Sequence, residues 1–142
     1  MTLLDVNILL YAYNADAPQH AASAAWLEEA LRTADVVGLP WPTVWAFLRL
    51  STNPRVWPNP LPAAEAFRII NELLALPSVV LVQPGPRHME IFELVTSKFR
   101  AAGPLMSDAV LAALAMENGA ALASTDRDFS RFEDMRWINP LS

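Results

Sequence analysis

The sequence is poor in the residues on which several common kinds of active site depend. It contains no cysteine, which excludes disulfides and thiolate metal sites. Its four glycines leave no place for a glycine-rich phosphate loop, and it has no Gly-x-Ser-x-Gly elbow. Both histidines, His20 and His88, fall near expected helix starts and have no obvious nucleophile partner. Nucleotide-dependent transfer and triad hydrolysis are therefore disfavoured.

Positive charge and long apolar runs are also scarce. The net charge of −5 argues against a protein that binds nucleic acid mainly through its own positively charged surface. A metal-dependent nuclease stays open, because bound divalent ions reverse the local sign at an acidic site. No apolar stretch reaches the roughly 18 residues that span a bilayer, and the amino terminus lacks the features of a secretory signal. We expect a soluble, cytoplasmic protein with no membrane partner.

Apolar segments of two kinds alternate along the chain. Short strands are expected at the amino terminus before Asp5 and then at residues 35–40, 79–82, 120–124 and 137–138. Helices are expected between them, after Asp5 and at residues 19–32, 41–51, 62–76, up to about residue 100, and from residue 107 to 118. Because no hairpin signal occurs, the pattern predicts one α/β domain over residues 1–142, with a central, mostly parallel sheet of four to five strands.

Four aspartates lie where the expected core segments meet loops. Asp5 follows the first strand, Asp108 opens the last long helix, and Asp126 and Asp128 follow the fourth strand. The carboxyl ends of parallel strands share one edge, which is where ligands bind in such sheets. Each acid could instead be an ordinary cap or turn residue. If they converge, a cation must neutralise them, and oxygen ligands favour magnesium or manganese over zinc.

Four short motifs occur in order over nearly the whole chain. They are Leu4-Asp5-Val6-Asn7, Phe47-Leu48-Arg49 with Ser51-Thr52-Asn53-Pro54-Arg55-Val56, Ser107-Asp108-Ala109, and Ser124-Thr125-Asp126-Arg127-Asp128-Phe129. Any one of them is weak, but together they resemble the motifs of PIN domains, specifically of VapC-type ribonuclease toxins from bacterial toxin-antitoxin pairs. The resemblance implies a PIN-like three-layer α/β/α sandwich.

The same resemblance implies an activity and its partners. It implies an endoribonuclease that uses magnesium or manganese to cut structured RNA, such as transfer RNA or a ribosomal RNA loop. Asp5, Asp108 and Asp126 match the family's metal-site acids, and Asp128 matches an acid that some members add. A cognate VapB-type antitoxin and a homodimer are also implied. A phosphatase or a DNA nuclease built on the same acids is the rival from the same chemistry.

Three polar residues beside the acids receive supporting or local roles. Asn7 and Thr125 match positions that support the acidic site in the family. From the residues alone, Asn7 could equally cap the first helix, and Thr125 could equally stabilise a turn. Ser107 is expected to be the N-cap of the helix that follows it.

The candidate RNA contacts come from basic and aromatic residues. They are Arg49, Arg55, Arg127 and Trp57. Trp57 lies in a proline-rich segment and is expected at the surface, whereas Trp45, at helical spacing with Leu48, is expected in the core. Arg131 is expected to pair with Asp128 or Glu133.

One position departs from the family pattern. The glutamate that the family usually has just before the Leu-Leu-Arg type sequence is Ala46 here, and no acid occurs between Val36 and Ala64. A site that lacks this ligand should bind metal more weakly, unless Asp128, Glu65 or Glu28 replaces it. The second interpretation is therefore a catalytically impaired PIN domain that acts as a binding module.

Overall fold

The structure is a computed structural model that describes residues 1–33 and 35–142. The strands within these residues are β1 (Thr2–Leu4), β2 (Val37–Pro40), β3 (Val79–Val82), β4 (Ala121–Ala123) and β5 (Trp137–Ile138). The helices are α1 (Val6–Ala12), α2 (His20–Arg32), α3 (Trp41–Ser51), α4 (Ala63–Ala75), α5 (His88–Lys98), α6 (Leu105–Glu117) and the short 3-10 helix η1 (Arg127–Arg131).

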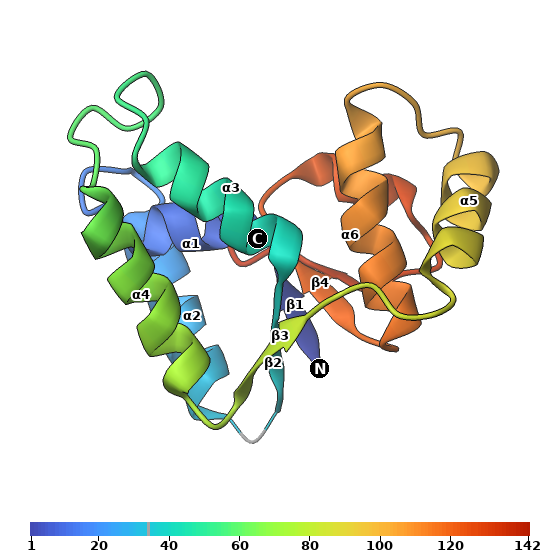
Figure 1. The fold of residues 1–142 in the computed structure, drawn as a ribbon, viewed down its shortest axis with the longest axis horizontal. Helices are drawn as coiled ribbons and strands as arrows, with labels where there is room; N and C mark the ends of the chain where they lie inside the picture. Colours follow the sequence, from blue (N-terminus) through green and yellow to red (C-terminus); the bar gives the residue numbers. More distant parts are fainter. Residues whose placement is uncertain (34) are drawn as a thin grey trace.

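All strand pairs in the sheet are parallel. The strand order is β3-β2-β1-β4-β5, so β1 is central and its two neighbours, β2 and β4, come from distant parts of the chain. Helices α1 to α4 cover one face and α5 and α6 cover the other, with the sheet between them (Figure 1). The predicted three-layer α/β/α sandwich is confirmed. Its topology brings the carboxyl ends of β1, β2 and β4 to one edge.

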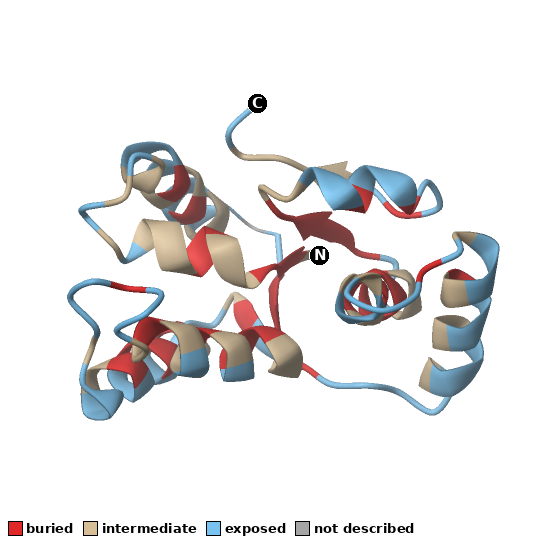
Figure 2. Ribbon diagram, turned by 90° about the horizontal axis from the view of Figure 1, so that it is seen from above, coloured by how far each residue is buried: buried red, intermediate tan, exposed pale blue. Residues whose placement is uncertain are grey.

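The sheet divides the apolar interior into two cores. Successive residues of a strand point to opposite faces, so Leu3 packs with α5 and α6 whereas Leu4 packs with α1 to α4. Burial is concentrated on the sheet and on the helix faces turned toward it (Figure 2). Gly38 in β2 is required by this packing, because a Cβ there would lie 2.3 Å from Leu3 Cδ2. The inner strands are therefore held from both sides.

Two predictions about tryptophan burial are wrong. Trp45 is 61% exposed, because the buried face of α3 is formed by Thr43, Val44, Phe47 and Ser51 and position 45 points away from it. Trp57 is only 5% exposed, although the segment around it is rich in proline. The turn after α3 folds back, and the backbone N–H of Trp57 donates to the carbonyl of Asn53 (2.9 Å). The expected surface role of Trp57 in RNA binding is thereby contradicted.

Three smaller predictions also fail. The helical spacing of apolar residues in the sequence predicts that Phe67 and Leu94 face inward. They are instead 52% and 60% exposed, because α4 buries Ala66, Ile69, Ile70 and Leu73 and α5 buries Val95. Ser107 is not an N-cap, because α6 begins at Leu105 after Pro104.

Within residues 1–33 and 35–142, no helix combines the length and apolar character needed to cross a membrane.

Candidate active site

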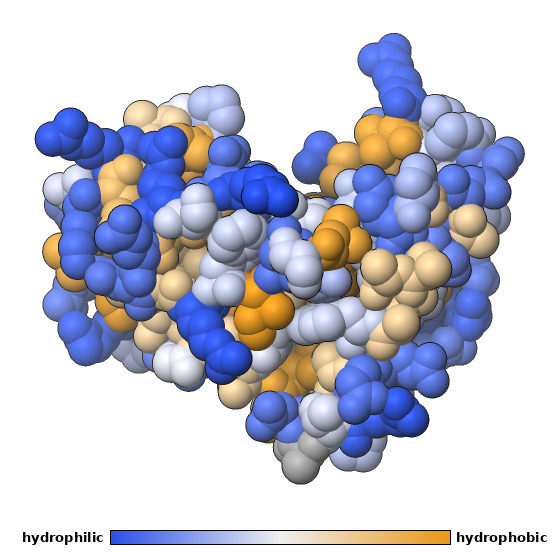
Figure 3. All heavy atoms as spheres, turned by 180° about the vertical axis from the view of Figure 1, so that it is seen from behind, coloured by the Kyte–Doolittle hydropathy of each residue, from blue (hydrophilic) through white to orange (hydrophobic). Residues whose placement is uncertain are grey.

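Three aspartates converge at the carboxyl edge of the sheet. Asp126 lies just beyond β4 and caps η1, Asp128 lies in the first turn of η1, and Asp108 lies in the first turn of α6. One carboxylate oxygen from each lies within 4.8 Å of the others. Figure 3 shows a notch in the molecular surface between helices α1 to α4 on one side and α5 and α6 on the other. The structure therefore brings together three of the four predicted acids as a compact donor set.

The fourth acid, Asp5, lies deeper and is held by hydrogen bonds. Its side chain is only 8% exposed, and it follows β1 directly. Its Oδ1 accepts from the backbone N–H of Val6 (2.7 Å), so the N-cap interpretation is confirmed. Its Oδ2 accepts from Ser124 Oγ (2.6 Å) and Asn7 Nδ2 (3.2 Å). Burial, despite these bonds, raises the pKa of Asp5. The residue is both a helix cap and part of the acidic edge.

Ser124 connects the ends of β1 and β4. It is completely buried, and besides donating to Asp5 its Oγ accepts from the backbone N–H of Asp126 (3.0 Å) and from Asn7 Nδ2 (3.1 Å). No role for Ser124 is predicted from the sequence. The available signal was a serine two residues before Asp126 at the end of a strand, a spacing at which a hydroxyl can accept from the backbone two residues on. This serine fixes two acids at once.

Asn7 and Thr125 meet across the same edge. The backbone N–H of Thr125 donates to Asn7 Oδ1 (3.1 Å), while Asn7 Nδ2 donates to Asp5 and Ser124. Asn7 is the second residue of α1, whose cap is Asp5. The contact from Thr125 comes from its backbone. Both residues therefore lie beside the acids, in contact with the groups that hold them.

Asp108 carries the most strongly perturbed charge of the edge. Burial, together with the negative charges of Asp126, Asp5 and Asp128, raises its pKa to about 6. The guanidinium of Arg131 opposes this rise. The predicted pairing of Arg131 with Asp128 or Glu133 does not occur among the described residues. The acids are thus crowded and only weakly compensated by a nearby cation.

A pocket of about 210 Å³ extends from the acids to α3. Asp5 and Asp108 line one side of it, and Ala46 and Arg49 line the other. Ala46 therefore occupies the wall at which a longer acidic side chain would reach the same space. A larger hollow of about 460 Å³ lies at the opposite edge of the sheet, near Met1 and Asp134, and none of the predicted site residues lines it.

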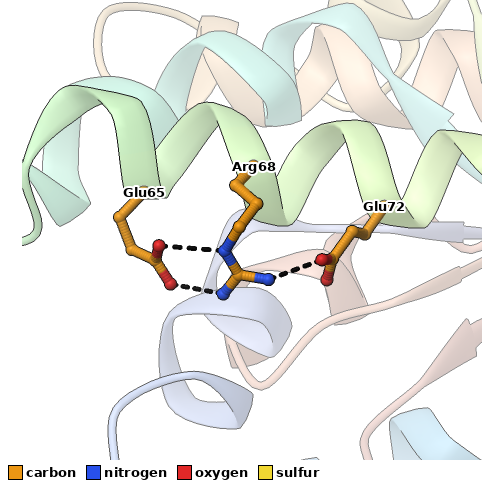
Figure 4. A network of polar contacts seen from close by, with 3 residues as sticks. All are labelled: Glu65, Arg68 and Glu72. Carbon is orange, nitrogen blue, oxygen red and sulfur yellow. Dashed lines mark hydrogen bonds and ion pairs between the residues drawn. The ribbon is translucent and has the colours of Figure 1, made fainter.

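The two glutamates considered as replacements at Ala46 point elsewhere. Figure 4 shows Arg68 on α4 between Glu65 and Glu72, with Arg68 Nε donating to Glu65 Oε2 (2.9 Å) and Arg68 Nη1 to Glu72 Oε1 (2.6 Å). Glu65 is thereby engaged within its own helix. Glu28 is exposed on α2, beside Tyr13. Neither lines the acidic pocket.

The three arginines predicted to contact RNA come from different parts of the fold. Arg49 lines the pocket itself. Arg127 is exposed between Asp126 and Asp128 in the sequence, and Arg55 is exposed in the turn after α3. The structure therefore brings Arg49 and Arg127 to the acidic edge and leaves Arg55 at the end of the neighbouring turn.

The fold and the site together place the chain in a class of protein: α/β domains with a parallel sheet and an acidic site at its carboxyl edge. Comparison with known proteins names the family: the PIN domain model matches residues 2–135. The chain belongs to the PIN domain family.

Among curated relatives, the chain is 43% identical to "Ribonuclease VapC37" of Mycobacterium tuberculosis over 140 residues, which cover 99% of this chain and 97% of that protein. It is 42% identical to "Ribonuclease VapC31" of the same species, with 99% of each chain covered.

Solved structures share the fold. A VapBC2 complex from Rickettsia felis, bound to a promoter DNA fragment, has a TM-score of 0.72 at 13% identity and 97% coverage of both chains. VapC20 of Mycobacterium tuberculosis, described as a sarcin-ricin loop cleaving toxin, has a TM-score of 0.63 at 17% identity, covering 92% of this chain and 93% of that one. At these identities the likeness concerns the fold alone.

Proposed function

We propose that this chain is a magnesium- or manganese-dependent endoribonuclease, the toxin of a type II toxin-antitoxin pair. Its substrate is structured RNA, such as transfer RNA or a ribosomal RNA loop, and a cognate VapB-type antitoxin neutralises it. The observation that carries this proposal is the set of three aspartates whose carboxylate oxygens lie within 4.8 Å of one another at the carboxyl edge of the sheet. Curated relatives named as ribonucleases over their full length support it.

The residues present fit a hard divalent cation. Asp108, Asp126 and Asp128 offer oxygen donors, which magnesium and manganese prefer, and the raised pKa of Asp108 marks negative charge that a cation would relieve. These three residues would hold the ion, with Asp5 completing the acidic environment from behind. A divalent ion held there would supply an activated water molecule and charge stabilisation on the phosphate during in-line attack.

The chain's own side chains divide the remaining work. Ser124 and Asn7 orient the Asp5 carboxylate, and Ser124 also fixes the backbone of Asp126. Arg49 lies in the same pocket as Asp5 and contacts a phosphate of the RNA, with Arg127 and Arg55 extending this contact outward. A positive side chain is needed because the acidic edge repels the RNA backbone.

The related structures support the proposed antitoxin partner. Neighbours in fold include complexes described as VapBC from Rickettsia felis and from nontypeable Haemophilus influenzae. These neighbours support a VapB-type antitoxin as the partner of this chain, and the homodimer is proposed only from the resemblance of its motifs to VapC-type toxins.

The test is cleavage of total RNA by purified, antitoxin-free protein with manganese. The parent should cut, and Asp108→Asn should not. Asp134→Asn is the matched control, because Asp134 lies at the opposite edge of the sheet and pairs with Lys98 (2.5 Å). Cleavage that survives in Asp108→Asn refutes the assignment of the site. Release of phosphate from small esters, or cutting of DNA without preference for RNA, supports the rival phosphatase or DNA nuclease.

The position of Ala46 gives the binding-module interpretation a specific test. Ala46 lines the pocket beside Asp5 and Asp108, where the family's glutamate would stand. If the parent is silent and Ala46→Glu restores cutting, the present chain is an impaired PIN domain. Cutting by the parent refutes that interpretation.

A further inference from the structure

An exposed aromatic side chain lies beside the acidic pocket. Trp45 is 61% exposed and packs against Trp41, with ring centroids 5.7 Å apart and planes 28° apart. Because Trp41 holds one side of the ring, its orientation is fixed while much of its surface stays open to solvent. A preorganised ring of this kind loses little conformational freedom on binding a flat partner.

The next residues of α3 connect this ring to the acids. Ala46 follows Trp45 directly and lines the pocket, and Arg49 lines the pocket one turn further on. Residues four apart lie on the same side of a helix, so Trp41, Trp45 and Arg49 form one surface, here called the Trp45 ledge. It presents an aromatic ring, then a cation, at the rim of the acidic site.

We propose that the Trp45 ledge stacks an unpaired base of the RNA next to the phosphate that is cut. This inference rests on the proposed function and names how its substrate is held. Single-stranded RNA offers bases that stack on aromatic side chains and phosphates that bind arginine, and the ledge supplies both groups in sequence. The aromatic contact also provides binding energy that does not depend on net charge, which suits a chain whose net charge is −5.

The exposed area of the Trp45 side chain argues against a protein as the occupant of the ledge. Within α3, all of whose residues the structure describes, Trp45 is the one large hydrophobic side chain that is exposed. A tryptophan side chain buries at most about 250 Å², so 61% exposure leaves about 150 Å². A stable protein interface buries about 800 Å² on each partner. One exposed ring, stacked on Trp41 and beside a cation, matches a base better than it matches a second copy or a peptide.

The experiment measures RNA binding separately from cutting. The probe is a 12-nucleotide oligoribonucleotide that contains 2-aminopurine, whose fluorescence falls when the base stacks on an aromatic ring. Binding is measured with manganese on the Asp108→Asn chain, which keeps the RNA intact, with and without Trp45→Ala. Loss of one stacked base should weaken binding about 5- to 150-fold and abolish the quenching, whereas Trp45→Phe should retain most of both.

Controls separate the ledge from the fold and from the proposed function. Leu94→Ala removes an equally exposed apolar side chain, 60% exposed on α5, and should leave binding unchanged. If the parent cuts RNA and Trp45→Ala binds the probe and cuts as the parent does, the ledge is overturned while the proposed function stands. If the parent cuts no RNA but Trp45-dependent quenching persists, the proposed function is overturned while base stacking on the ledge stands. A changed oligomeric state in sedimentation, with unchanged RNA affinity, assigns the ring to a protein interface and also overturns the proposal.

Discussion

Replacement of Asp108 by asparagine should stabilise the metal-free protein at neutral pH. Burial and the neighbouring carboxylates raise the pKa of Asp108 from 3.8 to about 6. At 1.36 kcal/mol for each pKa unit, the ionised group costs at most about 3 kcal/mol of folding free energy. The side chain is partly exposed, so solvent screening reduces this to about 1 kcal/mol, or about 4 °C in Tm for a domain of this size.

The effect has a defined pH window. Below pH 3.8 the carboxyl is protonated in both the folded and the unfolded chain. With respect to this group, the folded protein is then more stable than it is at neutral pH, where Asp108 is ionised. This stabilisation is lost as the pH rises through about 6. The advantage of Asp108→Asn should therefore be small near pH 4 and complete above pH 6.

Thermal unfolding followed by circular dichroism, in EDTA at pH 4.5 and 7.5, measures this difference. Manganese should reverse the order at pH 7.5, because the parent gains binding energy that the variant lacks. Asp134→Asn, which alters an exposed ion pair with Lys98, should not gain stability at either pH. An Asp108→Asn chain that is no more stable than the parent in EDTA at pH 7.5 would show that the carboxylates are not crowded and would contradict the prediction.

Three further substitutions test the surroundings of the site. Ala46→Glu adds a carboxylate beside Asp108, so it should lower Tm in EDTA and raise manganese affinity in titration calorimetry; a higher Tm without metal contradicts this. Ser124→Ala removes three hydrogen bonds in the buried edge, so it should lower the free energy of unfolding in urea by about 1–3 kcal/mol. The control Ser130→Ala, at an exposed position, should lower it by less than about 0.5 kcal/mol. Equal losses would contradict the prediction. Gly38→Ala places a Cβ 2.3 Å from a Leu3 methyl carbon and should cost about 1–3 kcal/mol by the same method, whereas an unchanged midpoint would show that β1 moves aside freely.

The order of the elements could be predicted because their sequence signals are local. The run of residues 79–82 consists of β-branched and apolar residues bounded by a serine and a proline-rich turn, and it forms β3 as expected. Residues 19–32 and 62–76 show helical spacing and form α2 and α4 with their ends within one residue of those predicted. Their apolar faces face the sheet because no other surface could bury them.

The environment of single residues depends on tertiary packing and could not be predicted in the same way. Trp45 and Trp57 are of the same type, yet the turn after α3 buries the second while the first lies opposite the buried face of its helix. Ser124 belongs to no periodic pattern, and its spacing to Asp126, the one signal in the sequence, is also that of an ordinary turn serine. Its role arises only when β1 and β4 pair, because Asp5 comes from the other end of the chain.

The acidic edge consists of two parts that differ in how their charge is met. Asp5 is almost fully buried, but a backbone N–H, a hydroxyl and an amide all donate to it, so its geometry is fixed by the protein itself. Asp108 is more exposed, yet burial and its neighbours' charges raise its pKa to about 6, and the opposing cause is the charge of Arg131. Preorganised donors already satisfy the first carboxylate, whereas the second gains most from a cation. Folding alone would favour an uncharged residue at position 108, which supports the proposed role of Asp108 in holding a cation.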